Sequence, residues 1–164
     1  MNRCTSMKAS WKTGLGFGLT SGVITTVGLI VGLHSGTHSR TAVLGGILTI
    51  AIADALSDAL GIHIAEEANR RGPSAHVWES TAVTFAAKFT VAVSFAIPVL
   101  LLSLETAVIA SLIWGISLLC LLSWIMARAQ QLPTWTVVGE HLIIACAVIV
   151  ITFYLGRFVS KTFG

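Results

Sequence analysis

The stretch Ile52–Glu67, which reads IADALSDALGIHIAEE, places two aspartates in a segment otherwise apolar enough to cross a membrane. An aspartate near the centre of a bilayer costs about 2.5–3.5 kcal/mol on insertion scales, whereas each apolar neighbour returns only about 0.3–0.6 kcal/mol. Asp54 and Asp58 therefore nearly cancel the insertion energy of their own helix. Such a helix persists only if neighbouring helices shelter the carboxylates, or if a cation or a proton neutralises them.

The composition is that of an integral membrane protein with almost no soluble part. Of the 164 residues, 55% are hydrophobic and 10% are charged, whereas a soluble domain has about 25% charged residues. Lysines and arginines are scattered without a basic patch, so no nucleic-acid partner is expected. The cysteines lack metal-ligand spacing, and no cleavable signal peptide is expected. Because nucleophile–base, phosphate-loop and cofactor motifs are missing, we predict neither an enzyme nor a bound cofactor.

Five apolar runs come close to the length of about 20 residues that a spanning helix needs. They predict an all-α integral membrane protein, a single domain over residues 1–164, with transmembrane helices at about 14–33, 42–65, 81–103, 106–127 and 137–158. With the N-terminus inside, the inner segments hold Arg3, Lys8, Lys12, Arg70, Arg71 and Arg128, and the outer ones hold Arg40, Arg157 and Lys161. This asymmetry predicts a cytosolic N-terminus and an external C-terminus. The expected location is the inner membrane of a prokaryotic cell.

Acidic side chains form two groups in the second predicted span. Asp54 and Asp58 are four residues apart, so they lie on one helix face, where two ionised carboxylates would repel each other. The sequence therefore predicts a shared proton, a bridging cation or a lysine partner. His63, Glu66 and Glu67 also share a face, nearer the inner end of the helix. That second group is either the mouth of an ion path or a solvated helix end.

Lys88 and Pro98 are the unusual residues of the third predicted span. By the helical rise, Lys88 lies about two turns deep, at the same depth as Asp58, so the two form a candidate buried ion pair. The alternative is that Lys88 extends to the inner surface. Pro98 is expected to kink or loosen the helix toward its outer end.

The first predicted span combines regularly spaced glycines with hydroxyl side chains. The glycines, which permit close helix contacts, are compatible with packing inside one chain or with a homodimer seam; they are Gly14, Gly18, Gly22, Gly28 and Gly32. The hydroxyls of Ser21 and Thr25 either line an ion path or bond back to the carbonyls of their own helix.

Three segments of the chain resemble the vacuolar iron transporter family, whose members export ferrous iron and manganese. They are FGLTSGVITTVGLIVGL at Phe17–Leu33, ADALSDALGIHIAEE at Ala53–Glu67 and FYLGRFV at Phe153–Val159. They are similar to the first helix, the second helix and the closing motif of the family.

The chain also departs from the family pattern at the positions that matter for ion chemistry. Where the family has aspartate, methionine, glutamate and tyrosine, this chain has Ser21, Asp58, Ile62 and His63. The long cytosolic metal-binding insert between the second and third helices is absent, so this would be a short member. The positive charge of Lys88 is expected to take the place that a metal cation would otherwise occupy.

The resemblance implies a homodimer in the lipid bilayer, with helices 1 and 2 at its interface, that exports a divalent metal, Fe²⁺ or Mn²⁺, from the cytosol in exchange for protons. The candidate metal ligands are Asp54, Asp58, His63, Glu66 and Glu67, with Ser21, Thr25 and Lys88 along the transport path or in proton coupling. Oxygen and imidazole ligands suit such ions. The alternative is a homologue that moves no metal, acting as a dimeric membrane adaptor or as a carrier of another solute, with Asp58–Lys88 as a structural ion pair.

Overall fold

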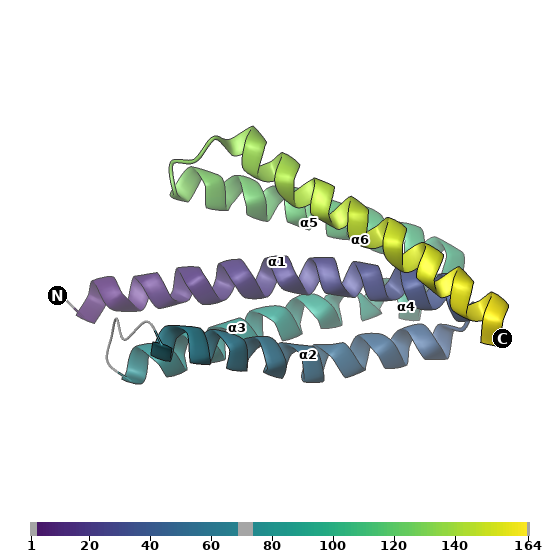
Figure 1. Ribbon diagram of the computed structural model, residues 1–164, viewed down its shortest axis with the longest axis horizontal. Helices are drawn as coiled ribbons and strands as arrows, with labels where there is room; N and C mark the ends of the chain where they lie inside the picture. Colours follow the sequence, from purple (N-terminus) through teal and green to yellow (C-terminus); the bar gives the residue numbers. More distant parts are fainter. Residues whose placement is uncertain (1–2, 69–73, 164) are drawn as a thin grey trace.

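The computed structural model describes residues 3–68 and 74–163, and this part of the chain is helical throughout apart from short connections (Figure 1). The helices are α1 (Arg3–Thr37), α2 (Arg40–Ala68), α3 (Ser74–Ser94), α4 (Ala96–Leu101), α5 (Leu104–Ala129) and α6 (Thr134–Phe163). Arg70 and Arg71, which contribute to the predicted orientation, lie outside the described residues. The all-α prediction is confirmed.

Five helical stretches in the described part are long and apolar enough to cross a membrane, as predicted. They cover residues 12–37, 40–68, 75–101, 104–129 and 134–163, with α3 and α4 together forming the third. The helices extend beyond the predicted spans because polar residues near the helix ends stay helical and bond to the backbone. Thr37 donates to the carbonyl of Leu33 at 2.7 Å, and the N–H of Ala42 donates to Ser39 at 3.3 Å. The structure is therefore that of a multi-pass membrane protein.

The third span is interrupted where Pro98 predicts a break. Because proline has no N–H, the carbonyl of Ser94, four residues earlier, loses its helical donor, and α3 ends at Ser94. The N–H of Phe95 instead bonds to the carbonyl of Ala92 at 3.2 Å, and α4 begins at Ala96. The predicted loosening is confirmed.

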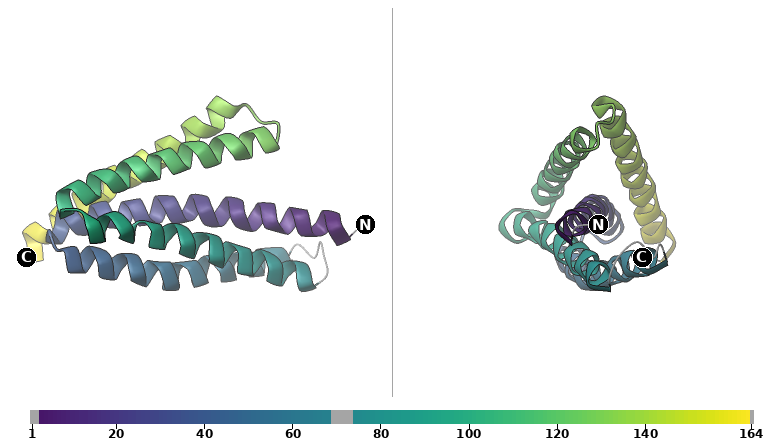
Figure 2. Two further views of the ribbon diagram at one scale, coloured as in Figure 1. Left: turned by 180° about the vertical axis from the view of Figure 1, so that it is seen from behind. Right: turned by 90° about the vertical axis from the view of Figure 1, so that its left-hand side faces the viewer.

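Helix α1 lies at the centre of the bundle, between the pair α2–α3 and the pair α5–α6 (Figure 2). Its core side chains Val23, Val27 and Ile30 are buried. The α5–α6 pair diverges from α1 toward the end of the bundle that holds the N-terminus (Figure 1). Most large side chains on α5 and α6 point outward, as expected for lipid-facing helices.

The regularly spaced glycines of α1 (Gly14, Gly18, Gly22, Gly28 and Gly32) pack inside the chain, against two different helices. A Cβ atom at Gly18 would lie 2.7 Å from the carbonyl oxygen of Thr84 on α3. A Cβ atom at Gly32 would lie 3.4 Å from Thr152 on α6. The N-terminal half of α1 thus packs closely on α3, and the C-terminal half packs on α6. Of the two interpretations of these glycines, the structure shows packing within the chain.

Candidate ion site between α1, α2 and α3

Lys88 on α3 is the largest fully buried side chain among the described residues, and its side chain is only 1% exposed. Its ammonium lies 2.6 Å from Oδ2 of Asp54 and forms a second ion pair with Oδ2 of Asp58. It also donates a hydrogen bond to Oγ of Ser21 at 3.0 Å. Lys88 therefore points into the bundle, and the alternative in which it extends to the membrane surface is excluded.

Ser21 on α1 closes the group by donating a hydrogen bond to Oδ2 of Asp58 at 2.7 Å. Its oxygen accepts a hydrogen bond from Lys88 and its O–H group donates one to Asp58, so the hydroxyl acts as both acceptor and donor. Three helices consequently contribute to one polar cluster: Ser21 from α1, Asp54 and Asp58 from α2, and Lys88 from α3. We refer to these four residues as the Lys88 cluster.

Small residues on α1 and α2 bring the three backbones close enough for the Lys88 cluster to form. A Cβ atom at Gly22 would lie 3.3 Å from the side chain of Lys88. On α2, the alanines on the face next to the aspartates are almost fully buried; they are Ala51, Ala55 and Ala59. Any larger side chain at these positions would push α1 or α2 away from α3.

The Lys88 cluster brings two carboxyl groups to a single amino group. The side chains of Asp54 and Asp58 are 32% and 20% exposed. Both ion pairs of Lys88 are made to Oδ2 atoms, and neither Oδ1 atom accepts a hydrogen bond from any described residue. Lys88 thus leaves one oxygen of each carboxylate open to a proton, a cation or water.

The second predicted group, His63, Glu66 and Glu67, does not assemble into one site. Nδ1 of His63 lies 2.9 Å from the hydroxyl of Thr81, and its ring packs edge-on against Trp78 with centroids 4.7 Å apart. Glu66 lies 3.5 Å from Nε2 of His76. Glu67 is exposed. In the chain as described, no three His, Cys, Asp or Glu side chains come together to hold a metal ion.

Thr25, predicted as a neutral oxygen of the path, bonds to its own helix. Its hydroxyl donates to the carbonyl of Ser21 at 2.9 Å, which is the local alternative that the sequence left open. The partners Thr81 and His76 were not anticipated. His76 comes only ten residues after Glu66 in the sequence, across the short connection between α2 and α3. This closeness was the signal from which the contact of His76 with Glu66 could have been predicted.

Comparison with protein-family models, with curated proteins and with solved structures finds no match to this chain. Membership of the vacuolar iron transporter family, which the three short segments quoted above predict, stays a prediction.

Proposed function

We propose that this chain is a membrane carrier for a divalent cation, and that the cation exchanges with protons at the Lys88 cluster. The observation that carries the proposal is the convergence of two carboxyl groups, those of Asp54 and Asp58, on the single buried amino group of Lys88. Intramembrane carboxylates that are not fully paired commonly mark an ion or proton pathway.

Charge balance gives this carrier a simple exchange reaction. Two carboxylates, the ammonium and one bound proton make a neutral cluster, and a net charge in low dielectric would be costly. Two carboxylates, one divalent cation and a deprotonated Lys88 are neutral as well. Binding the cation would then release two protons, one from the carboxylates and one from Lys88, so Lys88 would compete with the cargo for Asp54 and Asp58.

The cargo that fits this ligand set is an ion that accepts oxygen ligands. Carboxylate and hydroxyl oxygens without thiolates suit Mn²⁺ and Fe²⁺, and the family resemblance suggests export of these two ions from the cytosol. His63 and Glu66 near the end of α2 have different partners, Thr81 and His76, so the proposal assigns binding to Asp54 and Asp58 first.

A homodimer would explain the exposed side of α2. Large apolar side chains follow one another along it and are more than half exposed; they are Leu48, Ile52, Leu56, Leu60 and Ile64. A second copy covering this side of α2 would bury these apolar side chains.

The burial of Lys88 also favours the second candidate function, in which the cluster is a structural ion pair. A side chain that is 1% exposed and has three partners is well suited to hold α1, α2 and α3 together. The chain would then be a dimeric membrane adaptor or a carrier of another solute.

Transport measured in proteoliposomes tests the first function. We expect wild-type protein to carry Mn²⁺ or Fe²⁺ with a matching pH change in the lumen, and Asp54→Asn and Asp58→Asn to abolish both signals. Glu140→Gln, which alters an exposed carboxylate on α6, is the control and should transport normally. If both asparagine variants transport the ion at the wild-type rate, the assigned site is wrong.

Calorimetry on Lys88→Met separates the two functions. If the cluster binds cargo, removal of the competing ammonium leaves Mn²⁺ binding intact or makes it tighter. If the cluster is only structural, neither wild type nor Lys88→Met binds the ion, and the variant loses its oligomeric state.

A further inference from the structure

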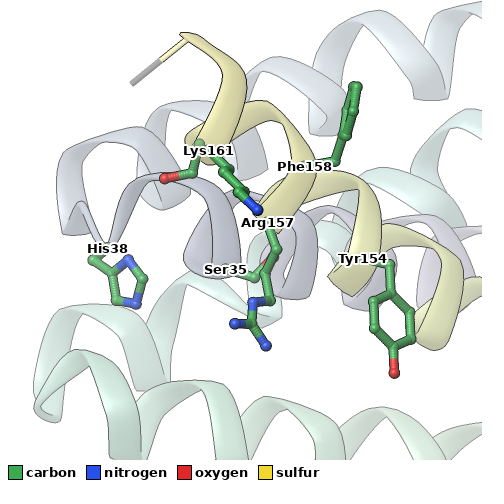
Figure 3. A pocket seen from close by; sticks show the side chains of 7 residues that line it. Ser35, His38, Tyr154, Arg157, Phe158 and Lys161 are labelled. Atoms are coloured by element: carbon green, nitrogen blue, oxygen red, sulfur yellow. The ribbon is translucent and has the colours of Figure 1, made fainter.

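A hollow of about 500 Å³ lies between the C-terminal end of α1 and the last turns of α6, at the end of the bundle that holds the C-terminus. Figure 3 shows the side chains around it: Ser35, His38, Tyr154, Arg157, Phe158 and Lys161. This volume is within the range of about 300–1,000 Å³ that is usual for ligand sites. About four turns of α1 separate Ser35 in the hollow from Ser21 in the Lys88 cluster, and the hollow plays no part in the proposed exchange.

The hollow is positively charged and has no acidic residue in its lining. Arg157 and Lys161 lie one turn apart on α6, and no carboxylate of the described residues lies within 4.0 Å of either. The guanidinium of Arg157 is held 5.7 Å from the ring centre of Phe153, a cation–π arrangement that leaves its N–H groups available. In Figure 3, His38 and Tyr154 lie on either side of Arg157.

Next to the hollow, α1 and α6 are in close contact through Ser35, which lines the hollow, and Gly156. Ser35 donates to the carbonyl of Phe153 on α6 at 3.1 Å. Gly156 is buried, and a side chain there would overlap the carbonyl oxygen of Gly32 and the hydroxyl of Ser35. Because this contact fixes α6 against α1, Arg157 and Lys161 are presented from a rigid frame.

An exposed apolar stripe continues from the hollow along the same face of α6 toward the middle of the membrane. Ile143, Val150, Tyr154 and Lys161 follow one another at intervals of seven, four and seven residues, which is the spacing of one helix face. Ile143 is 71% exposed, Val150 is 52% exposed and Tyr154 is 66% exposed. Exposed aromatic residues beside basic ones at a helix end are typical of the membrane interface.

We propose that this surface binds an anionic phospholipid. Arg157 and Lys161, with His38 beside them, bind the headgroup phosphate, and the acyl chains lie along the apolar stripe of α6. Guanidinium groups suit phosphate because they can donate two parallel hydrogen bonds to it. A free phosphate ion shares the headgroup chemistry but makes no use of the stripe, and for this reason we assign the site to a lipid.

Native mass spectrometry of the full-length protein in detergent tests the assignment, with added phosphatidylglycerol or phosphatidylcholine as probes. We expect retention of phosphatidylglycerol by the wild type and a loss of about fivefold in affinity for each charge removed in Arg157→Gln and Lys161→Gln. The charge-preserving pair Arg157→Lys with Lys161→Arg should retain the lipid, which separates loss of charge from loss of folding. The matched control is Arg128→Gln, since Arg128 lies 5.6 Å from the ring centre of Trp124 near the opposite end of the bundle.

Three results would overturn the proposal. One is unchanged retention of phosphatidylglycerol in the Arg157→Gln, Lys161→Gln double variant. Another is an equal loss in Arg128→Gln, which would indicate a general effect of surface charge. The third is displacement of the lipid by millimolar inorganic phosphate together with equal retention of phosphatidylcholine, which would assign the hollow to the free ion.

Discussion

At the scale of single residues, Lys88 determines what the polar cluster can do. Its depth, compared with that of Asp58, predicted an ion pair between α2 and α3, and this pair is present. A lysine partner was one of the three alternatives predicted for Asp54 and Asp58, and both contact Lys88. The sequence did not reveal that Ser21 would join the same ammonium. Depth along a helix can be counted from the sequence, but the rotation of each helix about its axis depends on packing. For the same reason, His63 could be placed near the end of α2, but its partner Thr81 could not be predicted.

We predict that Lys88→Met lowers the free energy of unfolding by about 3 kcal/mol, the low end of the cost of breaking a buried pair. The low end applies because the two carboxylates left behind are 20% and 32% exposed. Adding Asp58→Asn to Lys88→Met should restore part of the loss, since one unpaired charge is removed. Unfolding in detergent, analysed as a double-mutant cycle, measures this coupling. A coupling energy of zero would mean that the pair does not stabilise the fold.

At the scale of helices, close approach of α1 and α3 positions the Lys88 cluster. The spacing of the glycines predicted close contacts, but it could not distinguish packing within the chain from packing between chains. The structure shows two intrachain partners, α3 and α6. The break between α3 and α4 was predictable because it follows from the missing N–H of Pro98, which is a local property of the sequence.

We predict that Gly18→Ala destabilises the protein by about 1–3 kcal/mol, the usual cost of overpacking. The added Cβ atom would lie 2.7 Å from the backbone oxygen of Thr84, so α1 and α3 must separate and the contacts of Lys88 must lengthen. Gly45→Ala on α2 is the control, because nothing lies within 4 Å of the added atom. Thermal unfolding of the two variants checks this, and equal melting temperatures would show that the contact is dispensable.

At the scale of the whole molecule, five spanning segments follow from hydrophobicity alone, and the structure has five such helices in its described part. Their ends were less predictable, since residues such as Thr37 and Ser39 bond to the backbone and lengthen the helices. Association of two copies depends on which side chains of each helix face outward. The composition of an apolar segment does not show which face that is, so the dimer interface could not be predicted from the sequence.

We predict that the exposed face of α2 contacts a second copy. In a background with the native cysteines replaced by serine, Leu56→Cys should form a disulfide-linked dimer in membranes under mild oxidation. Ile113→Cys on α5 is the control; its side chain is 63% exposed, similar to Leu56 at 55%. Crosslinking at both positions to the same extent would indicate random collision, and crosslinking at Ile113 alone would move the interface to α5.

The division of the α1 glycines between α3 and α6 sets an order of events during biosynthesis. The N-terminal half of α1 meets its partner as soon as α3 leaves the ribosome, whereas the C-terminal half waits for the last helix to be translated. Until then Gly28, Gly32 and Gly36, the glycine ridge that packs on α6, face the lipid and are accessible to insertases and chaperones. A nascent chain that stalls before α6 would expose this ridge permanently, which would make it a recognisable substrate for the proteases that clear incomplete membrane proteins.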